Sequence, residues 1–176
     1  VAISGNLIGI GDPNNNAVRG RVYWYVRSSS DGTWNFIGSN DGTGDNDQFG
    51  TSLSISGNLA VVSEPFFGTG DNDGAIHWFK FKSGAWELIK RETFKTANTF
   101  FGFDVKIDGN YAIVGAPGNN GLATNVLGFA YIYEYRDGDW VLLKTFTGDA
   151  INDEFGEAVS ISGDYAIVGA PRQAVE

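Results

Sequence analysis

Hydrophobic residues fall into short runs along this chain, and glycine, asparagine and aspartate separate the runs. Residues 51–55 alternate between polar and apolar positions, whereas residues 59–63 and 111–115 are almost continuously apolar. Alternation is typical of a half-buried strand, and a short continuous run is typical of a strand buried on both faces. No stretch of the chain shows a convincing helical period, so we expect strands and no helix.

The pattern of runs repeats along the chain. All four prolines occupy one position in a repeat of about 50 residues: Pro13, Pro65, Pro117 and Pro171. A Phe-Gly pair precedes three of the copies, a later glycine opens an aromatic stretch, and a tryptophan follows each stretch. These landmarks are Phe49-Gly50, Phe101-Gly102 and Phe155-Gly156; Gly20, Gly74 and Gly128; and Trp34, Trp86 and Trp140. We therefore expect a single repeat array with units at approximately 1–48, 49–100, 101–154 and 155–176.

Each complete unit predicts four short strands. A tight Ser-Gly-Asn type of turn joins the first two strands, and a loop whose length varies between units follows the proline. The aromatic stretch is the third strand, and the tryptophan opens the fourth. Four antiparallel strands in about 50 residues are typical of a β-propeller blade. The predicted fold class is therefore an all-β propeller of four-stranded antiparallel blades, with about three and a half blades in this chain.

The repeated residues resemble those of a known family, the FG-GAP repeat of integrin-α-type β-propellers. Two units match the family pattern letter for letter, with Phe101-Gly102 before Gly115-Ala116-Pro117 and Phe155-Gly156 before Gly169-Ala170-Pro171. The second unit departs from the pattern at Ser63-Glu64-Pro65. The resemblance implies a ring of seven blades. We therefore expect an excised part of a longer protein, whose open blade edges would favour self-association.

Calcium-binding members of that family carry an aspartate-rich loop between the first two strands of a blade. In this chain the same place holds only short turns: Ser4-Gly5-Asn6, Ser56-Gly57-Asn58, Asp108-Gly109-Asn110 and Ser162-Gly163-Asp164. Such turns offer too few oxygen ligands for the six to eight that calcium takes, so we expect no cofactor there. Weaker metal candidates lie in the loop that enters the second unit: Asp41, Asp45 and Asp47.

The composition of the chain mainly excludes classes of partner and of activity. The net charge of −9 argues against nucleic-acid partners, and no apolar run approaches the length that inserts into a membrane. Cysteine is absent, and the one histidine, His77, takes a position that tyrosine fills in other units, which favours a packing role. The acidic residues lie in glycine-rich turns, where we expect water to keep them ionised. Paired-carboxylate catalysis is therefore not indicated, and we expect no enzyme activity from this chain.

Residues that differ between units are the place to seek a specific function. The loop after the second proline carries Phe66, Phe67, Asp71 and Asp73, which we take as candidate ligand-binding residues. The tryptophans recur in every unit and are therefore expected to pack between blades. We expect a non-catalytic recognition or adhesion module, extracellular or at a cell surface, that binds a protein or a glycan through its loops. Two alternatives stay open: a lectin that binds sugars between blades, and a propeller domain of a larger secreted enzyme.

Overall fold

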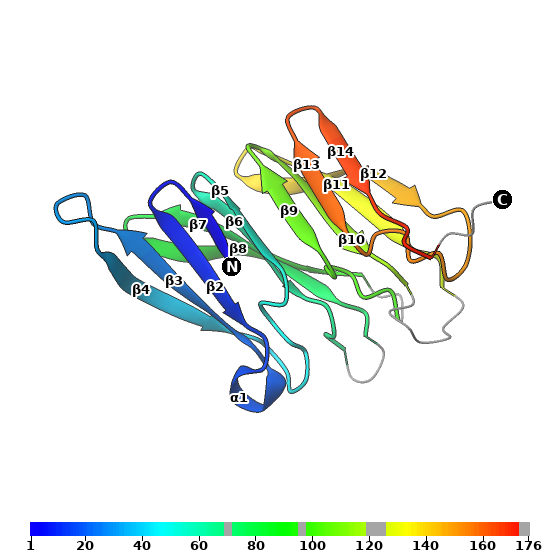
Figure 1. Ribbon diagram of the computed structural model, residues 1–176, viewed down its shortest axis with the longest axis horizontal. Helices are drawn as coiled ribbons and strands as arrows, with labels where there is room; N and C mark the ends of the chain where they lie inside the picture. The colour runs from blue at the N-terminus through cyan, green and yellow to red at the C-terminus, as the bar shows by residue number, and fades with distance from the viewer. Residues whose placement is uncertain (69–71, 95–97, 119–125, 173–176) are drawn as a thin grey trace.

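The computed structural model describes residues 1–68, 72–94, 98–118 and 126–172. Its strands form three four-stranded antiparallel sheets and one two-stranded sheet, which lie side by side in chain order (Figure 1). Blade 1 contains β1 (Ala2–Ser4), β2 (Leu7–Asp12), β3 (Arg21–Arg27) and β4 (Trp34–Asp41). Blade 2 contains β5 (Leu53–Ser56), β6 (Leu59–Glu64), β7 (Ala75–Lys82) and β8 (Ala85–Thr93). Blade 3 contains β9 (Val105–Asp108), β10 (Tyr111–Ala116), β11 (Phe129–Arg136) and β12 (Asp139–Thr147), and half-blade 4 contains β13 (Val159–Ser162) and β14 (Tyr165–Val168).

The predicted all-β class and the four-stranded antiparallel blades are confirmed. The expectation of no helix is wrong at one place, because α1 (Asn15–Val18) forms a single turn after Pro13. The Asn15 amide holds this turn by donating to Asp12 Oδ2 and Tyr23 Oη. So short a segment cannot show a helical period, and the pattern therefore gave no sign of the turn. No helix in the described residues is long and apolar enough to cross a membrane.

The recurring glycine and the Phe-Gly pair bring neighbouring blades into backbone contact. Gly74 of blade 2 forms a parallel bridge with Phe101, and Gly20 does the same with Phe49. A Cβ atom on Gly74 would lie 2.2 Å from the carbonyl oxygen of Phe101. The Phe101 ring is itself fully buried in the core between blades 2 and 3. Glycine therefore recurs here because the next blade's backbone occupies the space of a side chain.

Aromatic side chains fill the space between the blades. Trp86 stacks on Trp24 of the preceding blade at a centroid distance of 4.8 Å, and Trp140 stacks on Trp78 at 4.4 Å. The packing role expected for Trp86 and Trp140 is confirmed, since both are buried. Trp34, at the same position of blade 1, is 38% exposed, and the described residues place no blade in front of it.

The turns between the first two strands of each blade lie at one end of the blades (Figure 1). They form hydrogen bonds with the equivalent turns of the neighbouring blades. The Ser56 hydroxyl accepts the Gly109 amide at 2.9 Å, and Asp108 Oδ2 accepts the Gly163 amide at 2.8 Å. Ser4 accepts the Gly57 amide in the same way. The residues that stand where the family carries its calcium loop thus form hydrogen bonds between blades.

Candidate functional site

A buried acidic side chain lies at the end of β6, where the repeat has alanine in two other units. Glu64 has no exposed surface, and its Oε2 lies 2.9 Å from Nε2 of His77 on β7. Its Oε1 accepts the backbone amide of Thr43 at 2.7 Å, and the Thr43 hydroxyl also donates to this carboxyl group. Glu64 is therefore held by the neighbouring strand and by the loop that enters blade 2.

Arg91 on β8 contacts both Glu64 and the loop that follows Pro65. It pairs in register with His77, and its Nη2 lies 3.6 Å from Glu64 Oε2 and donates to the Thr43 hydroxyl at 3.3 Å. The guanidinium carbon lies 3.9 Å from the centre of the Phe67 ring, a cation–π contact. The Nε atom of Arg91 is buried and has no hydrogen-bond partner among the described residues. Arg91 thus connects the buried carboxyl group to the loop that follows Pro65.

Glu64, His77 and Arg91 are specific to blade 2, and we call them the blade 2 cluster. The strand registers place Tyr131 opposite Thr145 in blade 3, as they place His77 opposite Arg91 in blade 2. At the same three positions blade 3 carries Ala116, Tyr131 and Thr145, and blade 1 carries Asp12, Tyr23 and Ser39. The blade fold therefore forms without the cluster.

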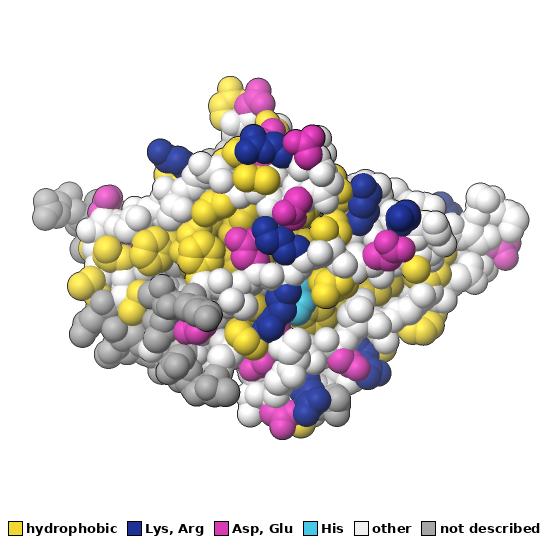
Figure 2. All heavy atoms as spheres, turned by 180° about the vertical axis from the view of Figure 1, so that it is seen from behind, with side chains coloured by type: hydrophobic (Ala, Val, Ile, Leu, Met, Phe, Trp, Pro, Cys, Tyr) yellow, Lys and Arg dark blue, Asp and Glu magenta, His cyan; other side chains and the backbone are white. Residues whose placement is uncertain are grey.

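A cavity of about 470 Å³ lies beside Arg91, between the loop that enters blade 2 and the loop after Pro65. Both loops lie at the end of the blades opposite the turns between the first two strands (Figure 1). Figure 2 shows acidic and basic side chains intermixed on the back of the molecule, without a large area of one charge. The side chains that line the cavity include Thr43, Asp45, Asp47, Phe67, Asp73 and Arg91.

Asp47 is the one aspartate of this cavity that is almost fully buried, with 6% of its surface exposed. Burial raises its pKa to about 6, and the nearby Glu64 carboxyl adds to the rise. At neutral pH Asp47 therefore stays mainly ionised, but the expectation that water surrounds the acids of these turns is wrong for this residue. The reason is the path of the loop, which turns inward through positive φ angles at Asn46 and Gln48. The same backbone path buries Thr99 and Asp153 at the corresponding positions of the next two units.

The repeat is also recognised by comparison with known families. Residues 95–133 and 148–175 match the model of the FG-GAP repeat. These two segments are FG-GAP repeats. The matched segments contain the two Phe-Gly and Gly-Ala-Pro pairs that are complete in this sequence. No curated protein matches the chain.

The FG-GAP fold brings together some of the predicted site residues and separates others. Phe67 and Asp73 line the cavity, whereas Phe66 packs edge-on against Phe100 with centroids 5.6 Å apart. Asp71 lies outside the described residues. Phe67 is half-buried and lies against the guanidinium group of Arg91.

The three weak metal candidates have different surroundings. Asp41 accepts Arg21 Nη2 at 2.9 Å, Asp45 accepts Arg19 Nε at 2.6 Å, and Asp47 lies deeper in the loop. Within the described part of the chain, no group of three or more His, Asp or Glu side chains could hold a metal ion. Asp45 and Asp47 instead contribute carboxyl groups to the cavity wall.

Sequence reasoning missed Thr43, Glu64 and Arg91 as site residues, and it took His77 only as a packing residue. A signal was present, because Glu64 replaces the alanine of the FG-GAP motif and His77 replaces a tyrosine. Comparing each unit position by position identifies both replacements. Arg91 stands at the same spacing after Trp86 as Thr145 does after Trp140, so the same comparison identifies it as well.

Proposed function

We propose that this FG-GAP protein is a non-catalytic recognition or adhesion module that binds a ligand in the cavity beside the blade 2 cluster, outside the cell or at its surface. The observation that carries the proposal is that Glu64, His77 and Arg91 replace alanine, tyrosine and threonine of an equally well-formed blade. A buried ion pair is weak evidence for a role in stability, because well-packed apolar residues of similar volume often serve the fold as well or better. A cluster that the fold does not need is best explained by recognition.

The contacts within the cluster favour binding over catalysis. Both oxygens of Glu64 have partners, because Thr43 donates to Oε1 and His77 lies against Oε2. Glu64 therefore holds its neighbours in place, and Arg91, Phe67 and Asp47 are the groups left to meet a ligand at the cavity wall. The set offers a guanidinium donor, an aromatic ring and a carboxyl group.

A glycan is the ligand class that this set favours within the broader proposal of a protein or glycan ligand. Sugar hydroxyls donate and accept hydrogen bonds, so one hydroxyl can donate to Asp47 while its neighbour accepts from Arg91. The half-buried Phe67 adds an apolar surface for the carbon face of a sugar ring. The lectin interpretation should therefore be tested first.

The proposal is tested by probing printed arrays of glycans and of extracellular proteins with the fluorescently labelled chain. We expect glycan binding that Phe67→Ala and Arg91→Gln each weaken at least tenfold. Thr145→Ala, at the position of blade 3 that corresponds to Arg91, is the matched control and should bind normally. Binding only to proteins, lost in the same two variants, would support recognition and reject the lectin. Binding that neither variant weakens would contradict the proposed site.

A further inference from the structure

The side chains that line the cavity beside the blade 2 cluster do not balance in charge. Asp45, Asp47 and Asp73 each contribute a carboxyl group, whereas Arg91 is the one cation among the described residues of the lining. The Nη2 atom of Arg91 also lies 3.6 Å from Oε2 of the buried Glu64, which opposes its charge and is not itself part of the lining. The cavity therefore presents an excess of negative charge to a ligand at neutral pH.

Arg19 reduces this excess at one of the three carboxyl groups. It donates to Asp45 at 2.6 Å, and both side chains of this pair are exposed. Asp47 is almost fully buried, and Arg91 favours its charge. Burial, which is the largest cause, and the nearby Glu64 and Asp45 together raise its pKa to about 6. A positive group bound beside Asp47 would therefore compensate a buried negative charge.

The position of Arg91 limits where such a positive group can lie. The guanidinium carbon is 3.9 Å from the centre of the Phe67 ring, so Arg91 already covers that face of the ring. A second cation would be repelled there and attracted to the carboxyl group of Asp47. An ammonium group has three N–H donors and no acceptor, and it forms charge-assisted hydrogen bonds with carboxylates. The cavity therefore favours a ligand with an ammonium group toward Asp47 and a hydrogen-bond acceptor toward Arg91.

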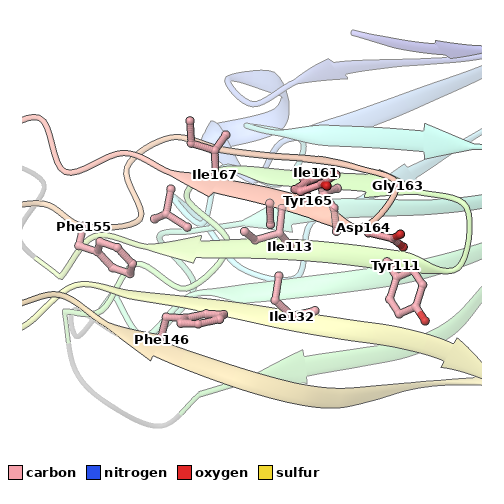
Figure 3. Close-up of a pocket in the computed structure, with 12 residues that line it drawn as sticks. Tyr111, Ile113, Ile132, Phe146, Phe155, Ile161, Gly163, Asp164, Tyr165 and Ile167 are labelled. Carbon is pink, nitrogen blue, oxygen red and sulfur yellow. The ribbon is translucent and has the colours of Figure 1, made fainter.

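A second cavity differs in the chemistry of its lining. It has a volume of about 640 Å³ and lies between blade 3 and half-blade 4. Figure 3 shows Ile113, Ile132 and Phe146 around it on neighbouring strands. Asp164 is the one charged side chain among the described residues that line it. The concentration of carboxyl groups thus belongs to the cavity beside the blade 2 cluster and not to this one.

We propose that the glycan bound beside the blade 2 cluster carries an unacetylated amino group, which donates to Asp47 while a hydroxyl group of the same sugar accepts from Arg91. This inference rests on the proposed glycan site and adds the class of sugar that the site takes. N-acetylation would remove the positive charge and two of the three N–H donors, and an acidic sugar would be repelled by the carboxyl groups. The cavity volume of about 470 Å³ lies within the range of small-molecule sites.

Three tetrasaccharides of one linkage separate these cases, because they differ only in bearing an amino, an acetamido or a hydroxyl group: those of glucosamine, N-acetylglucosamine and glucose. Isothermal titration calorimetry at pH 7 measures their binding to the full chain. We expect the glucosamine tetrasaccharide to bind at least tenfold more tightly than the other two. Asp47→Asn should remove this preference without unfolding the chain, because it removes a buried charge. Asp41→Asn removes the same charge outside the cavity and is the matched control.

The pH dependence of binding gives a readout that a purely structural role of Asp47 would not produce. Lowering the pH from 7 to 5 protonates Asp47, so binding of the glucosamine tetrasaccharide should weaken about tenfold. The amino group of the sugar gains protons over the same range, so its own titration would act in the opposite direction. His77 lies against Glu64 and does not line the cavity, and any effect of its protonation would persist in Asp47→Asn. We expect acid to cause no weakening in that variant.

Absence of binding by the glucosamine tetrasaccharide would overturn the inference, as would equal binding of all three sugars or a preference that Asp47→Asn leaves unchanged. If Phe67→Ala and Arg91→Gln still abolished binding of the neutral sugars, the proposed glycan site would stand and only the class of sugar would fall. Glucosamine binding that none of these variants weakens would contradict the site itself. A trilysine peptide that binds where the three sugars do not would overturn the inference and assign the ammonium group to a protein partner.

Discussion

The carboxyl group of Glu64 and the imidazole of His77 form a buried pair, with Oε2 and Nε2 2.9 Å apart. Removing one partner of such a pair leaves the other without compensation in a region from which water is excluded. Glu64→Ala would remove the carboxyl group that the Thr43 amide, His77 and the Nη2 group of Arg91 contact. We expect it to lower the free energy of unfolding by about 3 to 5 kcal/mol.

Urea denaturation followed by circular dichroism measures this loss. Glu64→Gln is the control, because its amide oxygen still accepts a hydrogen bond from Thr43 and fills the same volume. Glu64→Gln should lower the free energy of unfolding by less than half as much as Glu64→Ala. Equal losses for the two variants would show that charge, and not hydrogen bonding, holds the cluster together.

The raised pKa of Asp47 predicts how the stability of the folded chain changes with pH. Its pKa is raised to about 6 in the folded chain from an ordinary value of 3.8, so the folded state binds more protons than the unfolded state between these values. The chain therefore loses stability as the pH rises from about 4 to about 6, and the full loss remains at higher pH. Asp47→Asn removes the ionisation, so its stabilising effect should grow over this range and reach about 1 to 3 kcal/mol by pH 7.

Thermal unfolding of Asp47→Asn and wild type from pH 4 to pH 8 measures the effect. Asp41→Asn gives the opposite control, because hydrogen bonding to Arg21 lowers the pKa of Asp41. The Asp41 ion stabilises the folded chain above pH 3.8, and this stabilisation is lost as the pH falls through the lowered pKa. Its substitution should therefore cost stability at pH 7 and little in strong acid. A gain from Asp47→Asn that is constant across pH would contradict the burial of Asp47.

Gly74 should be intolerant of any side chain. Its φ is +81°, and a Cβ atom would collide with the backbone of Phe101 in the next blade. Gly74→Ala should therefore lower the free energy of unfolding by more than about 2 kcal/mol. Gly84 has a similar φ of +89° but open space around its Cβ position, so Gly84→Ala should cost only about 1 kcal/mol of backbone strain. If urea denaturation gave equal losses of unfolding free energy for Gly74→Ala and Gly84→Ala, the contact between Gly74 and the next blade would be contradicted.

The tryptophans of the repeat should differ in importance although they share one position. Trp140 is fully buried on Trp78, so Trp140→Ala should cost about 3 to 5 kcal/mol. Trp34 keeps 38% of its surface exposed, so Trp34→Ala should lower the free energy of unfolding clearly less than Trp140→Ala does. The midpoints of chemical denaturation compare the two directly. A large loss from Trp34→Ala would show that another surface covers it in solution.

Much of the fold could be predicted from the sequence because its determinants are local and repeated. Phe101 and Gly102 return at a fixed spacing, and the turn at Gly109 is encoded by adjacent residues, so the strands follow from position alone. The candidate site could not be predicted in the same way. Glu64 and Arg91 lie far apart in the sequence and meet only through the register of β6, β7 and β8, which periodicity does not supply.

Phe67 and Asp73 could be identified because the loop after Pro65 is unlike its counterparts in composition. The burial of Asp47 could not, since aspartate beside glycine and asparagine is also typical of exposed turns. Only the inward path of the backbone at this position distinguishes Asp47 from the exposed Asp45. Comparison of units identifies a residue that differs, but the packing of the loops decides what it contacts.

The most direct measurement for the proposed site is the free energy of unfolding of the triple variant Glu64→Ala, His77→Tyr and Arg91→Thr. This variant gives blade 2 the residues that blade 3 carries at the same positions. If the blade 2 cluster serves binding, the triple variant should recover most of the stability that Glu64→Ala alone loses, since it leaves neither His77 nor Arg91 behind without a partner. It should also lose the array binding of the wild-type chain. A triple variant less stable than wild type by about 3 kcal/mol or more, comparable to Glu64→Ala alone, would show that the cluster supports the fold and would contradict the account.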